Sequence, residues 1–334
     1  MKIIVDGFGG DHAPMEIVKG VVKAINENEG FSIVLAGDPE ILQAELAKYE
    51  YDAARVEILE AHDVITNDEV PTTAISTKPD STLVKSFLRL KTDEECVGMI
   101  SAGSTGAVLT GAILKLGRIR GINRPALCPM LPTVTGGQVL LIDCGANSEC
   151  KPQMLEQFGE MGTAYAKTVL GIENPRVAVL ANGTEDKKGT ELTHEAFKLL
   201  SVNPNVNFVG NMEARDILSG NYDVVVTDGF SGNIALKGCE GTAVAVFDLL
   251  KQGVKEGGIR AALGALLLKP VFRKLKHKMD YSENGGAAFL GVIKPVVKAH
   301  GSSKAKSVCA AIMQVKRMVD NNVTEQIKQY LPKL

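Results

Sequence analysis

Several signatures of common protein classes are absent from this sequence of 334 residues. It contains no tryptophan, and aromatic residues make up only 5% of the chain, which argues against a surface on which nucleic-acid bases stack. Lysine and arginine number 37 against 39 acidic residues, so a strongly basic nucleic-acid-binding protein is excluded. The chain has no C-x-x-C, H-E-x-x-H or G-x-S-x-G motif. Zinc ribbons, thioredoxin-type redox sites, zinc proteases and α/β-hydrolases are therefore disfavoured.

Long hydrophobic segments are also scarce. Residues 97–114 and 125–142 are uncharged and approach membrane-spanning length, but the first holds four glycines and the second three prolines. Strand–loop–helix units explain both stretches better than spanning helices do. The N-terminus lacks the apolar region of a signal peptide. Without C-x-x-C pairs, the six cysteines are expected to be reduced thiols in a cytosolic protein.

Short apolar runs, each followed by a polar, glycine-rich loop and a helical pattern, recur along the chain. The expected strands are 2–5, 31–36, 97–101, 138–142, 176–180 and 223–226. This alternation predicts an α/β fold with a largely parallel sheet, in which ligands bind beyond the carboxyl ends of the strands. No linker divides residues 1–334, so we expect a single domain, built on one sheet or on two interleaved subdomains.

The first of these loops only partly fits a dinucleotide-binding fingerprint. Gly7 and Gly9 match G-x-G, but His12 stands where the third glycine belongs. A nicotinamide-dependent dehydrogenase is therefore the weaker alternative. The loop that follows residues 97–101 contains small residues immediately before a helix, namely Gly103, Ser104, Thr105 and Gly106. Backbone amides of such a loop can bind an anion, and the absence of lysine distinguishes it from a Walker A loop.

Two further loops carry candidate donors. Lys188 comes just before Gly189 and a new helix, where a positive charge opposes the helix dipole. This suggests an anion nearby, although an ordinary surface lysine is the alternative. Asn233 follows another strand and lies at another helix start, where an amide suits an oxyanion or phosphate. The five histidines have no metal-ligand spacing, so we expect neither a metal nor a cofactor.

A basic stretch, residues 257–279, contains six lysines and arginines and no acidic residue. Its apolar residues recur at helical spacing and include Ile259, Leu263, Leu266 and Leu267. The pattern predicts two short amphipathic helices broken at Pro270, apolar on one face and basic on the other. Such helices are typical of membrane-surface elements, and Arg273 and Lys274 would contact anionic lipid or an acidic carrier protein. A helix pair that packs a dimer is the alternative.

Taken together, the loops resemble one family, the bacterial phosphate acyltransferases of phospholipid synthesis. The matching stretches are DGFGGDHAP at 6–14, SAGSTGA at 101–107, IDCGANSECKP at 142–152, GNMEARDIL at 210–218, DVVVTDGFSGNIALK at 223–237 and ENGGAAFLG at 283–291. They run from end to end of the chain. Departures are Gly7-Phe8 in place of Ala-Met, Ser104 in place of Asn, and residues 182–184 in place of Asn-Ile-Gly.

The resemblance implies a three-layer α/β/α fold with a mixed, largely parallel sheet, similar to phosphotransacetylases and to isocitrate and isopropylmalate dehydrogenases. It implies a cytosolic homodimer at the membrane surface that converts acyl-carrier protein and inorganic phosphate to acyl phosphate. The product would go to a membrane acyltransferase that acylates glycerol 3-phosphate. The alternatives are an acyltransferase that uses coenzyme A thioesters and a non-catalytic scaffold of lipid metabolism.

Site roles follow from this resemblance together with the loops. Lys188 and Asn233 are expected to be catalytic, holding phosphate or the developing oxyanion. The expected substrate-binding residues are Gly10, Asp11, His12, Gly103, Ser104, Thr105, Gly106, Asp143, Asn147 and Asp228.

Overall fold

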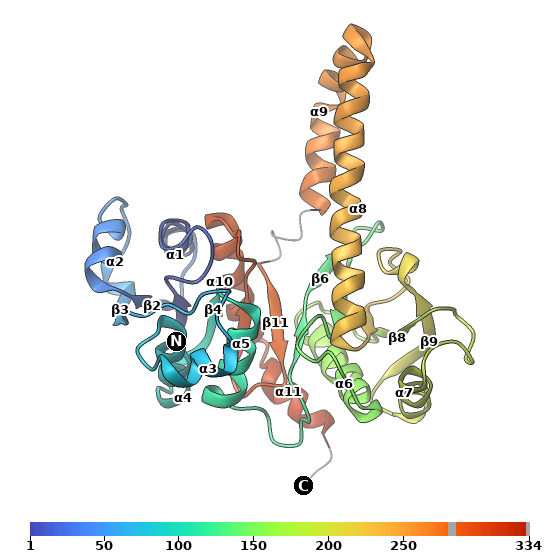
Figure 1. Cartoon of the computed structure of the whole chain (residues 1–334), viewed down its shortest axis with the longest axis horizontal. Coiled ribbons are helices and arrows are strands. Elements are labelled where there is room, and N and C mark those ends of the chain that lie inside the picture. The colour runs from blue at the N-terminus through green and yellow to red at the C-terminus, as the bar shows by residue number, and fades with distance from the viewer. Residues whose placement is uncertain (280–284, 332–334) are drawn as a thin grey trace.

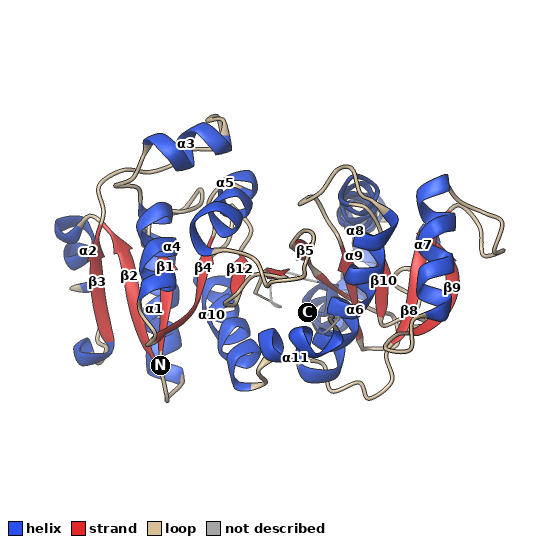
Figure 2. Cartoon of the chain, turned by 90° about the horizontal axis from the view of Figure 1, so that it is seen from below, coloured by secondary structure: helices blue, strands red, loops and turns tan. Residues whose placement is uncertain are grey.

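Two mixed β-sheets lie side by side in the computed structural model, which describes residues 1–279 and 285–331 (Figure 2). The larger sheet has the strand order β3-β2-β1-β4-β12-β11-β5, and the smaller one β6-β7-β10-β8-β9. The strands of the larger sheet are β1 Lys2–Asp6, β2 Ser32–Gly37, β3 Val56–Glu60, β4 Cys96–Ser101, β5 Ala126–Cys128, β11 Ala287–Leu290 and β12 Val296–Lys298. Those of the smaller sheet are β6 Met130–Pro132, β7 Gln138–Ile142, β8 Arg176–Ala181, β9 Asn207–Glu213 and β10 Val224–Val226.

Helices cover both faces of the larger sheet, because its central strands are apolar on both sides. In β1, Ile3 and Val5 pack toward one face, and Ile4 packs toward the other. The first face is covered by α1 (Met15–Glu27) and α10 (Ala305–Asp320), and the second by α4 (Thr82–Thr92). The remaining helices of this half are α2 Pro39–Leu46, α3 Pro71–Thr77 and α5 Thr105–Gly111, which continues as a π-helical turn over Ala112–Leu116. This is the expected three-layer α/β/α arrangement.

The smaller sheet is built in the same way. Its inner face packs against α6 (Pro152–Thr168) and α7 (Glu191–Val202), and the base of α8 (Gly229–Glu256) lies over the opposite face. One hydrophobic cluster runs from α1 and α10 through α11 (Val323–Tyr330) to α6. The two sheets therefore share a continuous core.

All six strands expected from the sequence are present as β1, β2, β4, β7, β8 and β10. The strands that the sequence analysis missed are mostly short or lie at sheet edges. β11 runs antiparallel to both β12 and β5, and β6 runs antiparallel to β7. These antiparallel pairs make both sheets mixed.

The long helix α8 projects away from the body, and α9 (Gly258–Met279) returns beside it (Figure 1). We call this pair the α8–α9 hairpin. The predicted break at Pro270 is wrong, since α9 continues through this residue. Proline removes one amide donor from the helix, and the surrounding leucine, lysine and arginine residues are good helix formers that allow it to continue. The projecting pair is thus α8 with α9, rather than two short helices within 257–279.

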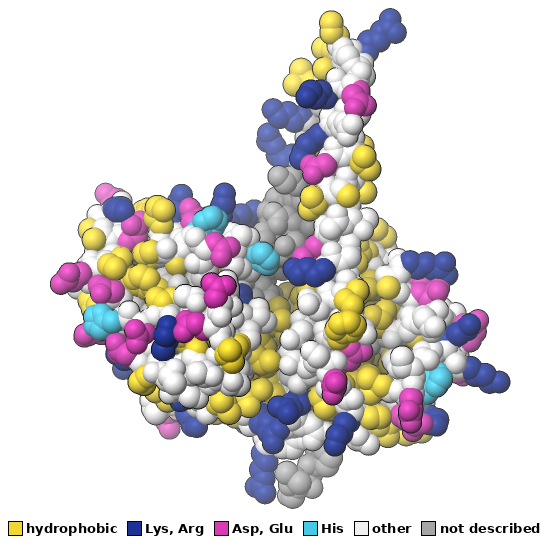
Figure 3. All heavy atoms as spheres, viewed as in Figure 1, with side chains coloured by type: hydrophobic (Ala, Val, Ile, Leu, Met, Phe, Trp, Pro, Cys, Tyr) yellow, Lys and Arg dark blue, Asp and Glu magenta, His cyan; other side chains and the backbone are white. Residues whose placement is uncertain are grey.

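The predicted separation of apolar and basic faces also changes on a continuous helix. Arg273 and Lys274 follow Leu266 and Leu267 by seven residues, or about two turns, and so lie on the same side of α9. Ile259, Leu263, Leu266 and Leu267 are 58–82% exposed. Figure 3 shows apolar and basic side chains interspersed along the hairpin. The side chains of 276–279, which include two lysines of the basic stretch, lie outside the described residues.

No helix in the described part of the chain is long and apolar enough to cross a membrane.

The start of α8 depends on a glycine, which gives a first prediction. A Cβ atom at Gly232 would lie 2.0 Å from the backbone oxygen of Asp143. Because backbone cannot move aside cheaply, Gly232→Ala should lower the free energy of unfolding by about 2–3 kcal/mol in urea denaturation. The matched control is Gly241→Ala in the same helix, where no atom lies within 4 Å of the added methyl group. That change should raise stability by about 0.5–1 kcal/mol. Equal effects of the two substitutions would contradict this account.

Candidate active site

A cavity of about 570 Å³ lies beside the segment that connects the two sheets, which runs from β5 of the larger sheet to β6 of the smaller one. Its apolar lining includes Leu127, Met130, Leu131 and Leu236. The polar lining consists of Asp11, Asn67, Thr105, Asn233, Lys237, Glu240, Lys298, His300 and Ser303, together with several glycines. The cavity can therefore take a ligand that has both an anionic and an apolar part.

The polar end lies at the carboxyl ends of three adjacent parallel strands. Asp6 ends β1, Ser101 ends β4, and Lys298 ends β12, where it pairs in register with Ser101. The hydroxyl of Ser101 donates to Asp6 Oδ2 at 2.7 Å. The order β2-β1-β4 means that the chain leaves β1 in one direction and returns at β4 on its other side. Loops diverge at such a switch point, and ligands bind in the resulting crevice.

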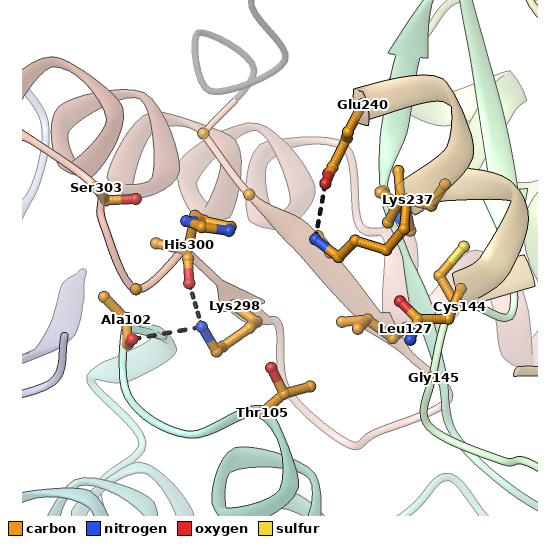
Figure 4. Close-up of a pocket in the computed structure, with 18 of the residues that line it drawn as sticks. Ala102, Thr105, Leu127, Cys144, Gly145, Lys237, Glu240, Lys298, His300 and Ser303 are labelled. Carbon is orange, nitrogen blue, oxygen red and sulfur yellow. Dashed lines mark hydrogen bonds and ion pairs between the residues drawn. The ribbon is translucent and has the colours of Figure 1, made fainter. Parts of the chain in front are cut away.

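Lys298 is the buried cation of this end, with only 8% of its surface exposed. Its Nζ donates to the carbonyl of Ala102 at 3.4 Å and to that of Ala299, as Figure 4 shows. Burial lowers the pKa of Lys298 to about 8, although the charges of Asp6 and Asp11 oppose this shift. Burial also raises the pKa of Asp6.

Glycines allow the loops after these strands to approach each other closely. A Cβ atom at Gly9 would lie 2.7 Å from the backbone nitrogen of Gly103. Gly10 has a φ of +101°, which side-chain-bearing residues rarely adopt. The amide of Asp11 donates to the carbonyl of Gly301 at 2.8 Å and ties the third loop to the first. The three loops thus form one floor under the cavity.

The helix α5 begins at this floor. Thr105 and Gly106 belong to its first turn and line the cavity. Amides of a first helical turn have no acceptor within the helix, and the helix dipole adds positive potential there. The expected anion cradle therefore faces the cavity through Gly103, Thr105 and Gly106.

The opposite wall is one face of α8. Asn233, Leu236, Lys237 and Glu240 follow the i, i+3, i+4, i+7 spacing of a helix face and line the cavity together. Lys237 Nζ makes an ion pair with Glu240 Oε2 at 2.7 Å. Both are drawn across the cavity from Lys298 in Figure 4.

Asp143 organises the loop on which α8 rests. It is fully buried and accepts hydrogen bonds from the amides of Leu127, Ala146 and Asn147 and from the Asn147 side chain, at 2.7–3.2 Å. Burial raises the pKa of Asp143, and these hydrogen bonds oppose the shift. The carboxylate therefore joins the end of β5 to the loop after β7.

The structure brings together only part of the residue set expected from the sequence. Asp11, Gly103, Thr105, Gly106 and Asn233 line the cavity. Gly10, His12, Ser104, Asp143, Asn147 and Asp228 are not lining residues. Among the latter, Asp228 caps α8 by accepting from the amide of Ser231. Lys188 is exposed on the loop between β8 and α7, also outside the lining, and its catalytic role stays a prediction.

The sequence analysis missed four lining residues, Lys237, Lys298, His300 and Ser303. Lys298 carried a signal, because a charged residue in the apolar run Val296–Lys298 suggests a buried function. Burial lowers the pKa of His300, with the charges of Lys237 and Lys298 adding to the effect.

The thiols are poor candidates for a covalent nucleophile. Cys144 lines the cavity, but burial raises its pKa well above the ordinary value. Burial likewise raises the pKa of Cys150 to about 12. A nucleophilic cysteine needs a lowered pKa, so the attacking group is more reasonably the substrate itself. In residues 1–279 and 285–331, no cluster of three or more His, Cys, Asp or Glu residues is placed to hold a metal ion.

Comparison with known proteins identifies the family. The chain matches the family described as fatty acid synthesis protein over residues 1–326. A phosphate acyltransferase of Clostridium novyi (strain NT) is 47% identical over 331 residues, or 99% of this chain and 98% of that protein. One from Listeria innocua serovar 6a is 46% identical over 334 residues, covering 100% and 97%. The chain belongs to this family of phosphate acyltransferases, which confirms the predicted resemblance and the acyltransferase class.

Solved structures support the fold. A phosphotransacetylase from Streptococcus pyogenes superposes with a TM-score of 0.64 at 18% identity, over 96% of this chain and 94% of the other. A 4-hydroxythreonine-4-phosphate dehydrogenase from Klebsiella pneumoniae gives 0.51 at 12% identity, over 95% and 99%. The expected relation to phosphotransacetylase and dehydrogenase folds is confirmed.

Proposed function

We propose that this enzyme transfers a long-chain acyl group from acyl-carrier protein to inorganic phosphate, in the synthesis of phosphatidic acid and phospholipids. The observation that carries the proposal is the mixed lining of the cavity. The first turn of α5 and the buried Lys298 can bind phosphate, and the apolar side chains of Leu127, Met130 and Leu131 can contact an acyl chain. A nicotinamide cofactor has no equivalent support, because the loop after β1 lacks the third glycine.

The chemistry needs only orientation and charge stabilisation. A phosphate oxygen of HPO₄²⁻ attacks the thioester carbon and forms a tetrahedral oxyanion. Collapse of this intermediate breaks the C–S bond, the sulfur takes the electron pair, and the proton of the phosphate passes to the thiolate. The products are acyl phosphate and a free thiol. Because thiols have a pKa near 8.5, the leaving group needs little acid catalysis. We expect Asn233, which lines the cavity, to donate to the oxyanion, because stabilising this charge is usually the largest single contribution to such catalysis.

A donor comparison tests the function. Purified protein, phosphate and the same long acyl chain on carrier protein or on coenzyme A are mixed, and acyl phosphate is trapped with hydroxylamine. We expect phosphate-dependent hydroxamate from the carrier-protein donor. A faster reaction with coenzyme A would favour the phosphotransacetylase-like alternative. Absence of phosphate-dependent thiol release with either donor would leave only a non-catalytic role.

Single substitutions test the assigned donors. Asn233→Ala should lower turnover by about a hundredfold or more, as loss of one oxyanion donor does, with an unchanged melting temperature because the side chain is exposed. Lys188→Ala should do the same if its loop closes on the substrate, and the neighbouring exposed Lys187→Ala serves as its control. A normal rate for Lys188→Ala alone would remove that residue from the site, while a normal rate for Asn233→Ala would refute the oxyanion assignment.

We further propose that the protein works in the cytoplasm at an anionic membrane surface, as a homodimer, and passes acyl phosphate to a membrane acyltransferase for glycerol 3-phosphate. The exposed apolar residues of the α8–α9 hairpin support this. On α9 they run from Ile259 near the turn to Leu275, and basic residues such as Arg260, Arg273 and Lys274 lie among them. Exposed apolar and basic side chains on one projecting hairpin suit binding to a bilayer whose headgroups are anionic. The same surface could instead pack a second copy or dock the acidic carrier protein.

The double substitution Leu263→Glu with Leu267→Glu separates these uses. It should abolish sedimentation with anionic liposomes and leave acyl phosphate synthesis in solution largely intact, because both side chains are remote from the cavity lining. The doubly substituted protein sedimenting like the wild type would refute membrane insertion. If it becomes monomeric in analytical ultracentrifugation, the hairpin packs the dimer. If only the KM for acyl-carrier protein rises, it docks the carrier.

A further inference from the structure

A buried ammonium group at the floor of the cavity has only neutral acceptors. The described residues supply two for Lys298 Nζ, the carbonyls of Ala102 and Ala299, whereas an ammonium group has three donors. Asp6 and Asp11 act on this amine through their charge, without an ion pair. Removing a positive charge from water is costly unless an opposite charge accompanies it. A bound anion would therefore stabilise the ammonium group of Lys298 more than water in the cavity would.

A second buried group points into the same cavity. Ser303 is 5% exposed, and its hydroxyl has no hydrogen-bond partner among the described residues. Buried hydroxyls are normally hydrogen-bonded. Lys298 and Ser303 come from the two ends of one short loop, between β12 and α10, and both line the cavity. Figure 4 shows them with Thr105 of α5 around the same space.

We infer that Lys298 and Ser303 bind the phosphate that attacks the acyl group, with Lys298 as its charge partner and Ser303 as a hydroxyl donor. The inference rests on the proposed function, because inorganic phosphate is the co-substrate of that reaction. The first-turn amides of α5 would contact the same anion. Lys237, the other lysine in the lining, is already paired with Glu240, and Lys188 is outside the lining.

Phosphate binding should then depend on the charge of Lys298. Because burial places the pKa of its amine at about 8, the ammonium form predominates below pH 8 and is lost as the pH rises through that value. The other titratable groups that line this space are Asp11 from the first loop, His300 beside Lys298, Lys237 and Glu240 on α8, and the Cys144 thiol. Asp6 at the end of β1 acts on Lys298 through its charge. The lowered pKa of His300 and the raised pKa of Cys144 place their titrations away from pH 8.

The test is the pH dependence of kcat/KM for phosphate from pH 6.5 to 9.5, at saturating acyl donor. For the wild type we expect a fall toward tenfold per pH unit above about pH 8. Lys298→Arg keeps a cation that does not titrate in this range, so its profile should lack that fall. The ionisation of phosphate itself is common to both proteins and cancels in the ratio of their profiles.

Neutral variants measure the size of the interaction. Lys298→Met should raise the KM for phosphate about 10- to 100-fold, as loss of a charged hydrogen bond does, while the KM for the acyl donor changes little. Ser303→Ala should raise the KM for phosphate about threefold to tenfold. Lys316→Met removes a cation from α10 outside the lining and should change neither constant. An apolar side chain of similar length suits the buried position, so Lys298→Met should fold, which a melting curve checks.

The outcomes separate this inference from the proposed function. An active wild type combined with an unchanged KM for phosphate in Lys298→Met would overturn the inference and leave the function intact. The same follows if wild type and Lys298→Arg give parallel pH profiles. If the wild type forms no acyl phosphate from either donor, both the function and the inference fail.

Discussion

Three parallel strands that end side by side impose the constraint on which the site depends. β1, β4 and β12 end at nearly the same level of the sheet. The backbones of the loops that follow them therefore have to pass in contact with one another. Side chains would block this approach, as the short distances from Gly9 and Gly10 to their neighbours show. The same closeness removes water from Asp6 and Lys298. A glycine-rich floor with a poorly hydrated charge is thus a consequence of strand register.

The other half of the cavity depends on a second close contact. Asp143 fixes the loop after β7, and Gly229 and Gly232 let the first turns of α8 rest directly on that loop. The orientation of Asn233 and Lys237 toward the cavity therefore follows from a buried carboxylate and two glycines. Asp143 lies outside the cavity lining, so we expect it to support activity by positioning α8 and not by touching the substrate.

The sequence predicted the fold well because the central strands are apolar on both faces and are followed by glycine-rich loops. It predicted that Gly103, Thr105, Gly106 and Asn233 belong to one site, and all four line the cavity, because the segments that carry them follow the carboxyl ends of strands. Lys298 and Ser303 were missed because β12 has only three residues and reaches the site through long-range pairing with β4. Lys188 was chosen on local helix electrostatics, and no local signal reports that its loop lies beyond the cavity. The predicted break at Pro270 was wrong because the loss of one hydrogen bond does not end a helix whose other residues favour it.

The length of α8 fixes the distance between the cavity and the turn of the α8–α9 hairpin. Asn233 lies in its second turn and Glu256 ends it, so the cavity and the turn of the hairpin are separated by roughly 35 Å at 1.5 Å per residue. A tip inserted into a bilayer would hold the cavity above the surface instead of immersing it. On the proposed function, acyl phosphate formed in the cavity would then have to cover that distance to reach the bilayer. Val246, Leu249 and Leu250 are exposed on this stretch of α8 at i, i+3 and i+4 spacing, and so share one face of the helix. One rigid helix thereby connects the face that lines the chemistry to the surface proposed to meet the membrane.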